Sequence, residues 1–473
     1  MSEMIRQTTR RGSFGIALAS LALAGCSTTA IDPERVAEAR AQTVPELPPE
    51  WTSARERVGA VEPGWIAQFN DPILDVLVAE ALANNRDLRA ARANVLRAQG
   101  LARQAGAALV PNVDAVGSAG RQQAIEGGGL SSYALGGQLV WEADIWGRIA
   151  SGGQAAVASA RSAEANYIFA QYAIAGAVAQ SYFLIIEADQ QVAVAQSIVD
   201  SLTEIRRIVS LRYRYGFASA FDVSLAESDL ASARDSLAAA QNGRLEALRA
   251  LEALLGRYPA ATLATAMEFP TLPPAPGAGV PAELLERRPD VISAERGIAA
   301  ALNSLDAAEA ARLPSLQITG ALGGASGRLE DLFDPTNILA NLGASILFPI
   351  FDGGRRQAQV DIADADLQAA IAAYGDTAII AFTEVESALD RGVYLAQRRE
   401  ALERANTETG NALRLITLQY QEGEIDLIDV LSIQQRVFGA QSSLLSIRRA
   451  QLDQYVELSL ALGGSWTDAE STE

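Results

Sequence analysis

The sequence contains no histidine and no lysine, and it has a single cysteine, at position 26. Without histidine, the Ser–His–Asp and Cys–His forms of nucleophilic catalysis are excluded, and one cysteine cannot form a disulfide within the chain. Arginine supplies all 38 basic residues against 57 acidic ones, and the net charge of −19 argues against a nucleic-acid partner, which requires a basic surface. We therefore expect no enzyme activity, no catalytic residues, no metal site and no bound nucleic acid.

The cysteine follows a short apolar segment at residues 14–25, which three arginines precede. Twelve residues cannot span a hydrocarbon core of ~30 Å, so this segment is expected to be a secretory signal that is removed. The motif LAGC at residues 23–26 resembles the bacterial lipobox, which implies a lipid on Cys26, and Ser27 after it favours the outer membrane. The alternative is an ordinary signal peptide with an incidental cysteine. No cofactor is expected apart from this covalent lipid.

Aromatic residues are scarce, at 6%, although hydrophobic residues make up 49% of the chain. This alanine-rich composition favours long, closely packed helices, and the length favours roughly two to four domains. LRYRYGFASAFDV at residues 211–223 matches LQYQEGEIDLIDV at residues 418–430 in five identical positions, at an offset of 207. The chain is therefore expected to be a tandem duplication.

Both repeats predict the same elements in the same order. Uninterrupted helical patterns cover about 151–211 and about 357–420, and second helices follow at 220–255 and 427–462. The two matching loops would then be the tips of two long helical hairpins, which we call the first tip (211–223) and the second tip (418–430). Helices this long, with small residues at their contacts, are typical of coiled coils.

Upstream of each long helix the periodicity changes to two. Apolar residues alternate with Gly, Ser, Gln and Thr around 135–141, 316–322 and 340–348, so each repeat is expected to supply one hairpin of two strands with one apolar face. Four strands cannot close a barrel, and open edges in lipid would leave backbone groups unpaired at several kcal/mol each. Membrane hairpins would thus require several copies of the chain. The alternative is a soluble sandwich edge.

Several motifs together resemble the TolC-like outer-membrane efflux proteins, and one of them resembles the inter-repeat signature of the NodT lipoprotein branch. They are Cys26; Trp65 with Phe69-Asn70-Asp71-Pro72; WEADIWGR at 141–148; FPIFDGGR at 348–355; and, for the NodT branch, PAELLERRPDV at 281–291. The resemblance covers nearly the whole chain from Cys26 to Gly464.

This resemblance implies a mainly α protomer with membrane β-strands. Three protomers would form a 12-strand β-barrel in the outer membrane and a 12-helix α-barrel across the periplasm. The expected partners are a homotrimer, a periplasmic adaptor, an inner-membrane pump of the resistance–nodulation–division type and outer-membrane lipid. The implied function is that of a channel-tunnel lipoprotein in a tripartite efflux system.

The repeats and the resemblance together predict six segments. These are a signal peptide at 1–25, an acylated segment and equatorial strap at 26–70, repeat 1 at 71–257, a Pro-rich equatorial segment at 258–282, repeat 2 at 283–464 and a C-terminal tail at 465–473.

The resemblance also places functional residues at the tips. Gly216 and Gly423 match the family's tip glycines, which meet the adaptor, although each could equally be a plain turn glycine with a positive φ. Threefold symmetry would make Asp426 and Asp429 acidic rings, and one or the other is expected to line a periplasmic constriction. The alternative is a solvated acidic turn. An N-cap role is the other alternative for Asp429, and likewise for Asp222 in the first tip.

Tyr213 and Tyr420 are expected to take part in the closed gate, as the family's tip tyrosine does. Two other functions compete with the channel. An enzyme is disfavoured because carboxylate pairs on coiled helices are usually solvated surface, and GGASGR at 323–328 lacks the spacing and lysine of a P-loop. A periplasmic spacer without a pore would differ from the channel by giving no single-channel conductance.

Overall fold

The computed structural model describes residues 33–53, 61, 64–123 and 128–464, so the predicted signal peptide, Cys26 and the tail at 465–473 lie outside the described residues. The chain divides into two compact units. Unit 1 comprises Met1–Val44, Ala93–Glu164 and Ser293–Asp376, and unit 2 comprises Pro45–Arg92, Ala165–Ile292 and Thr377–Glu473. Each unit therefore draws on both sequence repeats.

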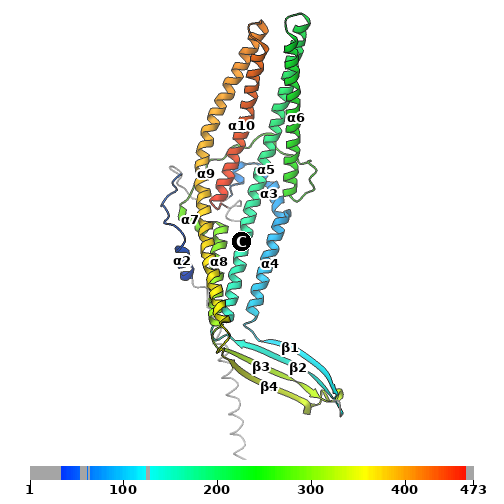
Figure 1. The fold of residues 1–473 in the computed structure, drawn as a ribbon, viewed down its shortest axis with the longest axis vertical. Helices are drawn as coiled ribbons and strands as arrows, with labels where there is room; N and C mark the ends of the chain where they lie inside the picture. Colours follow the sequence, from blue (N-terminus) through cyan, green and yellow to red (C-terminus); the bar gives the residue numbers. More distant parts are fainter. Residues whose placement is uncertain (1–32, 54–60, 62–63, 124–127, 465–473) are drawn as a thin grey trace, which may run out of the picture. The chain divides into compact units, whose positions relative to one another are not determined.

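The described chain is mainly helical, as the sequence predicts, and its two longest helices have 67 and 68 residues (Figure 1). The helices are α2 Pro33–Ala41, α3 Pro72–Asn84, α4 Arg86–Ala107, α5 Arg148–Arg214, α6 Ala220–Leu254, α7 Pro281–Arg287, α8 Pro289–Ala310, α9 Arg355–Glu422 and α10 Leu427–Ala461. Short 3-10 turns occupy Ala67–Phe69, Leu329–Asp331 and Pro335–Asn337. The two predicted helical hairpins are α5–α6 and α9–α10.

Helix α3 begins directly after Asp71 of the Phe69-Asn70-Asp71-Pro72 motif. Asp71 is its N-cap and accepts hydrogen bonds from the backbone N–H groups of Ile73 and Leu74, while Pro72 occupies the first turn. The second carboxylate oxygen of Asp71 accepts a hydrogen bond of 2.7 Å from the hydroxyl of the fully buried Tyr182 in α5. One side chain therefore caps α3 and satisfies a buried hydroxyl on the helix beside it.

The main core of unit 2 lies where α3, α5, α6 and α10 pack together. It includes Trp65 and Phe69, whose indole and phenyl rings meet edge to face. Within the described chain, α5 is the one helix long and apolar enough to cross a membrane. Its residues Val178, Tyr182 and Phe183 belong to this core, so packing accounts for part of the apolar stretch, of which 39% is buried.

The segment between the repeats has neither helix nor strand from Tyr258 to Val280, yet side chains of the helical body hold it. The carboxylate of Glu252, at the end of α6, accepts the backbone N–H groups of Ala261 (2.6 Å), Thr262 (2.8 Å) and Leu263 (3.1 Å). The buried indole of Trp51 donates to the carbonyl of Ala278 at 2.9 Å. Burial alone would raise the pKa of Glu252, but the backbone hydrogen bonds lower it below its ordinary value.

Unit 1 contains one antiparallel sheet in the order β1-β2-β3-β4, with β1 and β4 at its edges (Figure 1). The strands are β1 Asn112–Gln123, β2 Gly129–Ala143, β3 Ser315–Ser326 and β4 Ile338–Leu347. They form the two predicted hairpins, one in each repeat, and β2 pairs with β3 to join them.

The pairing register shows that the two faces of the sheet differ in polarity. One face is apolar over most of its length and carries Val113, Ala115, Leu135, Leu139, Trp141, Leu316, Ile318, Leu322, Leu342, Ala344 and Ile346. The other face is mixed but carries most of the polar side chains: Asn112, Asp114, Ser118, Ser132, Gln138, Glu142, Gln317, Thr319, Asn341 and Ser345, together with the apolar Val116, Val140, Leu339 and Leu347. An isolated soluble sheet with this pattern would leave Leu342 and Ile346 in water, where they are 76% and 74% exposed in this protomer.

A buried cluster of charged residues in unit 2 predicts that the stability of the protein depends on pH. Arg449 of α10 lies between two carboxylates, Glu187 of α5 and Asp453, and forms ion pairs with both. Among the described residues, one carboxylate oxygen of Asp453 has no hydrogen-bond partner. Burial, and then the negative charges of Glu457 and Glu187, outweigh Arg449 and raise the pKa of Asp453 from 3.8 to about 6.

A group whose folded pKa is raised stabilises the fold below its unfolded pKa and loses that contribution as the pH rises through the folded value. At pH 7.5 we therefore expect Asp453→Asn to increase the free energy of unfolding by roughly 1–2 kcal/mol and so to raise the thermal midpoint. At pH 4 we expect the substitution to change the midpoint little. Thermal unfolding of both proteins at the two pH values, in one detergent, measures this. A loss of stability at pH 7.5 would show that the charged form of Asp453 is needed.

Candidate functional site at the helix tips

Both long helices end in the same backbone motif. At the first tip the N–H of Phe217 donates to the carbonyl of Arg212 (2.8 Å), and the N–H of Gly216 donates to that of Tyr213 (3.0 Å). At the second tip Glu424 donates to Gln419 (3.0 Å) and Gly423 to Tyr420 (3.1 Å). These are Schellman motifs, which place the glycine in the left-handed region.

The conformation of the two turns explains why glycine occupies both tip positions. Gly216 has φ +81° and Gly423 has φ +84°, values that residues with a Cβ rarely adopt. No atom of the described chain lies within 4 Å of a Cβ added at either glycine. The space outside each tip is therefore open to another molecule.

The helices that follow the tips begin at the predicted residues, 220 and 427, but their N-caps lie three residues before the aspartates that were expected to cap them. Ser219 is the N-cap of α6, and Asp222 is the third residue of a capping box in which each side chain bonds the other's backbone. Asp426 is the N-cap of α10, without a side-chain bond, and Asp429 lies in the first turn. The predicted N-cap role of Asp222 and Asp429 is therefore wrong, because the helices start at the serine and aspartate three residues before them.

The two tips contact each other through a pair that sequence reasoning missed. The guanidinium of Arg212 lies 4.8 Å from the ring centroid of Tyr420 and donates to the Tyr420 carbonyl at 3.0 Å. Burial raises the pKa of Tyr420, while the positive charge of Arg212 acts in the opposite direction. The only sequence signal was a break in the repeat, since the position that matches Arg212 is Gln419.

The two predicted gate tyrosines differ in their exposure to solvent. Tyr420 is 9% exposed and belongs to the hydrophobic cluster between the tips, whereas Tyr213 is 50% exposed. Tyr420 therefore joins the hairpins, and Tyr213 faces outward with its hydroxyl available to another molecule.

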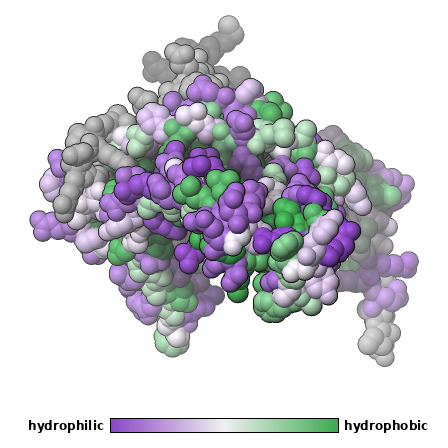
Figure 2. Space-filling model, turned by 90° about the horizontal axis from the view of Figure 1, so that it is seen from above, coloured by the Kyte–Doolittle hydropathy of each residue, from purple (hydrophilic) through white to green (hydrophobic). Residues whose placement is uncertain are grey.

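The surfaces of the two tips have different chemistry. The first tip exposes four aromatic side chains, Tyr213, Tyr215, Phe217 and Phe221. The second tip exposes four carboxylates, Glu422, Glu424, Asp426 and Asp429. Figure 2, which looks from above onto the end that carries the tips in Figure 1, shows hydrophobic groups set among hydrophilic ones on this face. Within the described residues no group of three His, Cys, Asp or Glu side chains is arranged to hold a metal ion.

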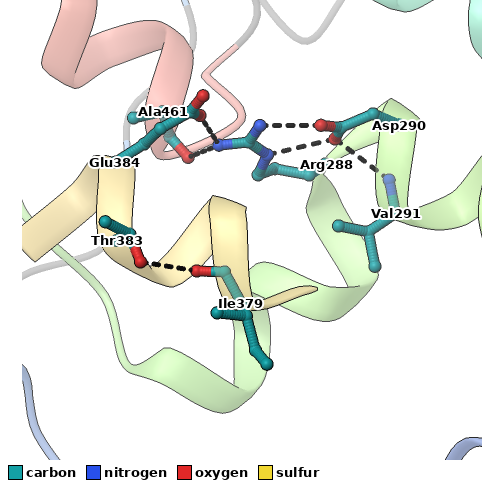
Figure 3. Close-up of polar contacts among 7 residues, drawn as sticks. All are labelled: Arg288, Asp290, Val291, Ile379, Thr383, Glu384 and Ala461. Atoms are coloured by element: carbon teal, nitrogen blue, oxygen red, sulfur yellow. Dashed lines mark hydrogen bonds and ion pairs between the residues drawn. The ribbon is translucent and has the colours of Figure 1, made fainter. Parts of the chain in front are cut away.

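The Arg-Arg-Pro-Asp motif has a different location, at the junction of α7, α8, α9 and α10 in unit 2 (Figure 3). The side chain of Arg288 is 4% exposed and forms a two-pronged contact with Asp290 (3.0 and 2.7 Å). Its remaining nitrogen donates to Glu384 at 2.6 Å and to the carbonyl of Ala461, the last residue of α10, at 3.2 Å. This specific motif therefore joins helices.

The fold and the tips together define a duplicated protomer in which paired helical hairpins are joined to a sheet with two free edges. The profile of the outer membrane efflux protein family matches residues 77–257 and 280–464, one match in each repeat. The pyoverdine export outer membrane protein OpmQ of Pseudomonas aeruginosa is 32% identical over 415 residues, or 85% of this chain and 87% of OpmQ.

Solved structures of outer-membrane channels have the same fold as this chain. The outer-membrane channel OprN has a TM-score of 0.83 and 26% identity, over 90% of this chain and 98% of OprN. The open-state MtrE outer membrane channel of Neisseria gonorrhoeae has a TM-score of 0.79 and 27% identity, over 90% of this chain and 99% of MtrE. The chain belongs to the outer membrane efflux protein family. It is an outer-membrane efflux channel of the TolC-like type.

Proposed function

We propose that three copies of this chain form the channel-tunnel of a tripartite efflux system, with a 12-strand barrel in the outer membrane and a 12-helix tunnel in the periplasm. The observation that carries the proposal is the sheet: it has unpaired edges at β1 and β4, an apolar face and a polar face. Closure with neighbouring copies pairs both edges, puts the apolar face in lipid and lines the lumen with the polar face.

The tunnel would receive its substrate from an inner-membrane pump of the resistance–nodulation–division type through a periplasmic adaptor. The tips support this, since both have open space at Gly216 and Gly423 and expose groups that a partner can contact. The pump would select the substrate, and the tunnel would do no chemistry, in keeping with a chain that has no histidine and no cysteine besides Cys26.

A lipid on Cys26 would hold the mature N-terminus at the outer membrane in addition to the barrel. Several acyl chains give a stable membrane anchor, because each buried CH₂ adds ~0.8 kcal/mol. The mass of the N-terminal peptide of the mature protein tests this assignment, and an unmodified cysteine would contradict it.

Conductance in planar bilayers tests the channel itself. The purified trimer is expected to give discrete single-channel currents, whereas a periplasmic spacer gives none. A stable monomer in lipid, or a lipid-embedded trimer without conductance under any applied voltage, would contradict the proposal.

We infer that Asp426 and Asp429 form carboxylate rings at the periplasmic end of the tunnel, and that Tyr420, with Arg212, and Tyr213 contribute to the gate. Threefold symmetry makes each aspartate a ring of three charges, which concentrates negative potential at a narrow opening. The exposure of both aspartates supports this role.

Asp426→Asn combined with Asp429→Asn is therefore expected to lower cation selectivity severalfold, as measured from the reversal potential in a salt gradient. The matched comparison is Glu422→Gln with Glu424→Gln, which removes the same charge from the same tip. An equal effect of both pairs would contradict a special position for the two aspartates.

A further inference from the structure

The two strand-to-helix junctions occupy matching positions in the repeats but differ in charge. The offset of 207 aligns Arg148 with Arg355, Glu142 with Pro349 and Asp144 with Phe351. At the first junction Arg148 pairs with Glu142 at 2.8 Å. The second junction has lost both acidic positions to apolar residues, while it has kept the arginine.

Arg355 is the cation that this loss leaves without a partner. The neighbouring Arg356 pairs with Asp352 at 3.5 Å and donates to the carbonyl of Ala311. Arg355 is exposed, and within the described part of the chain its guanidinium takes part in no hydrogen bond or ion pair, while its backbone N–H donates to the carbonyl of Asp352 at 3.4 Å. It lines a cavity of about 280 Å³ together with Ile145 and Trp146 of the first junction. The two acidic residues that also line this cavity are already engaged, Glu142 by Arg148 and Asp144 by backbone N–H groups at the start of α5.

The residues before Arg355 form an exposed apolar projection. Ile350 is 90% exposed and Phe351 is 92% exposed, and Phe348 is also exposed. They continue the chain directly from Ile346, which lies on the apolar face of the sheet. Ile145 and Trp146, which line the cavity beside Arg355, are exposed as well.

We propose that residues 348–355, with Ile145 and Trp146, form an interfacial anchor for phospholipid at the periplasmic leaflet. Ile350 and Phe351 insert at the boundary between headgroups and acyl chains, and Arg355 binds the phosphate of an anionic phospholipid. The continuity with the lipid-facing surface and the lone arginine both fit this occupant, because aromatic side chains favour the interface and arginine favours phosphate. The inference rests on the proposed channel function.

Spin-label accessibility tests the position of the projection in the full-length protein in lipid bilayers. A label on Phe351→Cys is expected to collide more with oxygen than with a water-soluble nickel chelate, as is one on Leu342→Cys in the middle of β4. The unsubstituted protein measures any labelling at Cys26. The anchor is wrong, and the channel proposal is unaffected, if the label at Leu342→Cys lies in lipid but the label at Phe351→Cys collides mainly with the chelate. The same holds if a second copy shields the label at Phe351→Cys from both reagents. If Leu342→Cys lies in water, the proposed function fails too.

The binding of lipid phosphate by Arg355 is tested separately, by native mass spectrometry of trimers released from bilayers of phosphatidylcholine and phosphatidylglycerol. Arg355→Gln is expected to reduce retained phosphatidylglycerol about fivefold, the factor that one surface arginine contributes. Arg355→Lys should keep most of it, and Arg148→Gln, whose arginine is already paired, should not change the ratio. An unchanged ratio in Arg355→Gln, or displacement of the lipid by inorganic phosphate, would overturn the assignment.

Discussion

Gly216→Trp and Gly423→Trp are each expected to abolish efflux while the trimer still assembles in the outer membrane. Each glycine sits at the left-handed position of a Schellman motif with open space around it, so an indole there projects into the region that a partner would occupy. Placing tryptophan at a positive φ costs about 1–3 kcal/mol of folding free energy. This cost is small beside the stabilisation from packing of helices that are 67 and 68 residues long, so the trimer should still form. The measurement is dye accumulation in cells that carry the cognate adaptor and pump.

Asparagine is the matched control for these variants, because it tolerates a positive φ better than other residues with a Cβ and adds little bulk. Gly216→Asn and Gly423→Asn should retain efflux and adaptor co-purification if the tryptophan acts by blocking close approach. Loss of efflux in the asparagine variants, with trimers intact, would show that the turn conformation alone matters. Normal efflux in both tryptophan variants would contradict docking at the tips.

Much of this fold was predictable because its elements have long, regular periodicities. Helices α5 and α9 extend a few residues beyond the predicted 151–211 and 357–420, since a helical pattern shows where apolar faces recur but not where the last hydrogen bond forms. Alternation located β2, β3 and β4, whereas β1 was expected only as the second strand of the first hairpin. The repeat at an offset of 207 identified the tips, and the structure gives both tips the same backbone motif.

Contacts between distant segments were not predictable. The pair formed by Arg212 and Tyr420 joins residues 208 apart, and only a mismatch between the repeats marked it. The starts of α6 and α10 were predicted at the residues where the structure has them, 220 and 427, but the N-cap role was assigned to the aspartates three residues after the true caps, because both a serine and an aspartate can cap a helix and sequence alone does not rank them. The Arg-Arg-Pro-Asp motif identified a family, yet its physical role became clear only from the four helices around Arg288.

Arg288→Ala is expected to destabilise the folded protein by about 3–5 kcal/mol, the cost of breaking a buried ion pair by removing one partner. The change leaves Asp290 and Glu384 without their shared cation, and it exposes the carbonyl of Ala461 to an unfilled site at the end of α10. Arg288→Lys should recover only part of the loss, because an ammonium cannot hold a carboxylate with two parallel bonds and reach the other acceptors as well. The rate of trimer unfolding at fixed temperature is the measurement, since unfolding of such assemblies is often irreversible.

The adjacent arginine provides the control, because it differs from Arg288 mainly in burial. Arg287 pairs with Glu283 four residues earlier, at 2.8 Å, and its side chain is 32% exposed against 4% for Arg288. Exposed pairs of this spacing contribute only about 0.3–0.5 kcal/mol, so Arg287→Ala should unfold at nearly the rate of the unsubstituted protein. Similar rates for the two alanine variants would mean that the charge at Arg288 is solvated in the trimer. A selective effect of Arg288→Ala would instead show that one guanidinium holds α8, α9 and the end of α10 together.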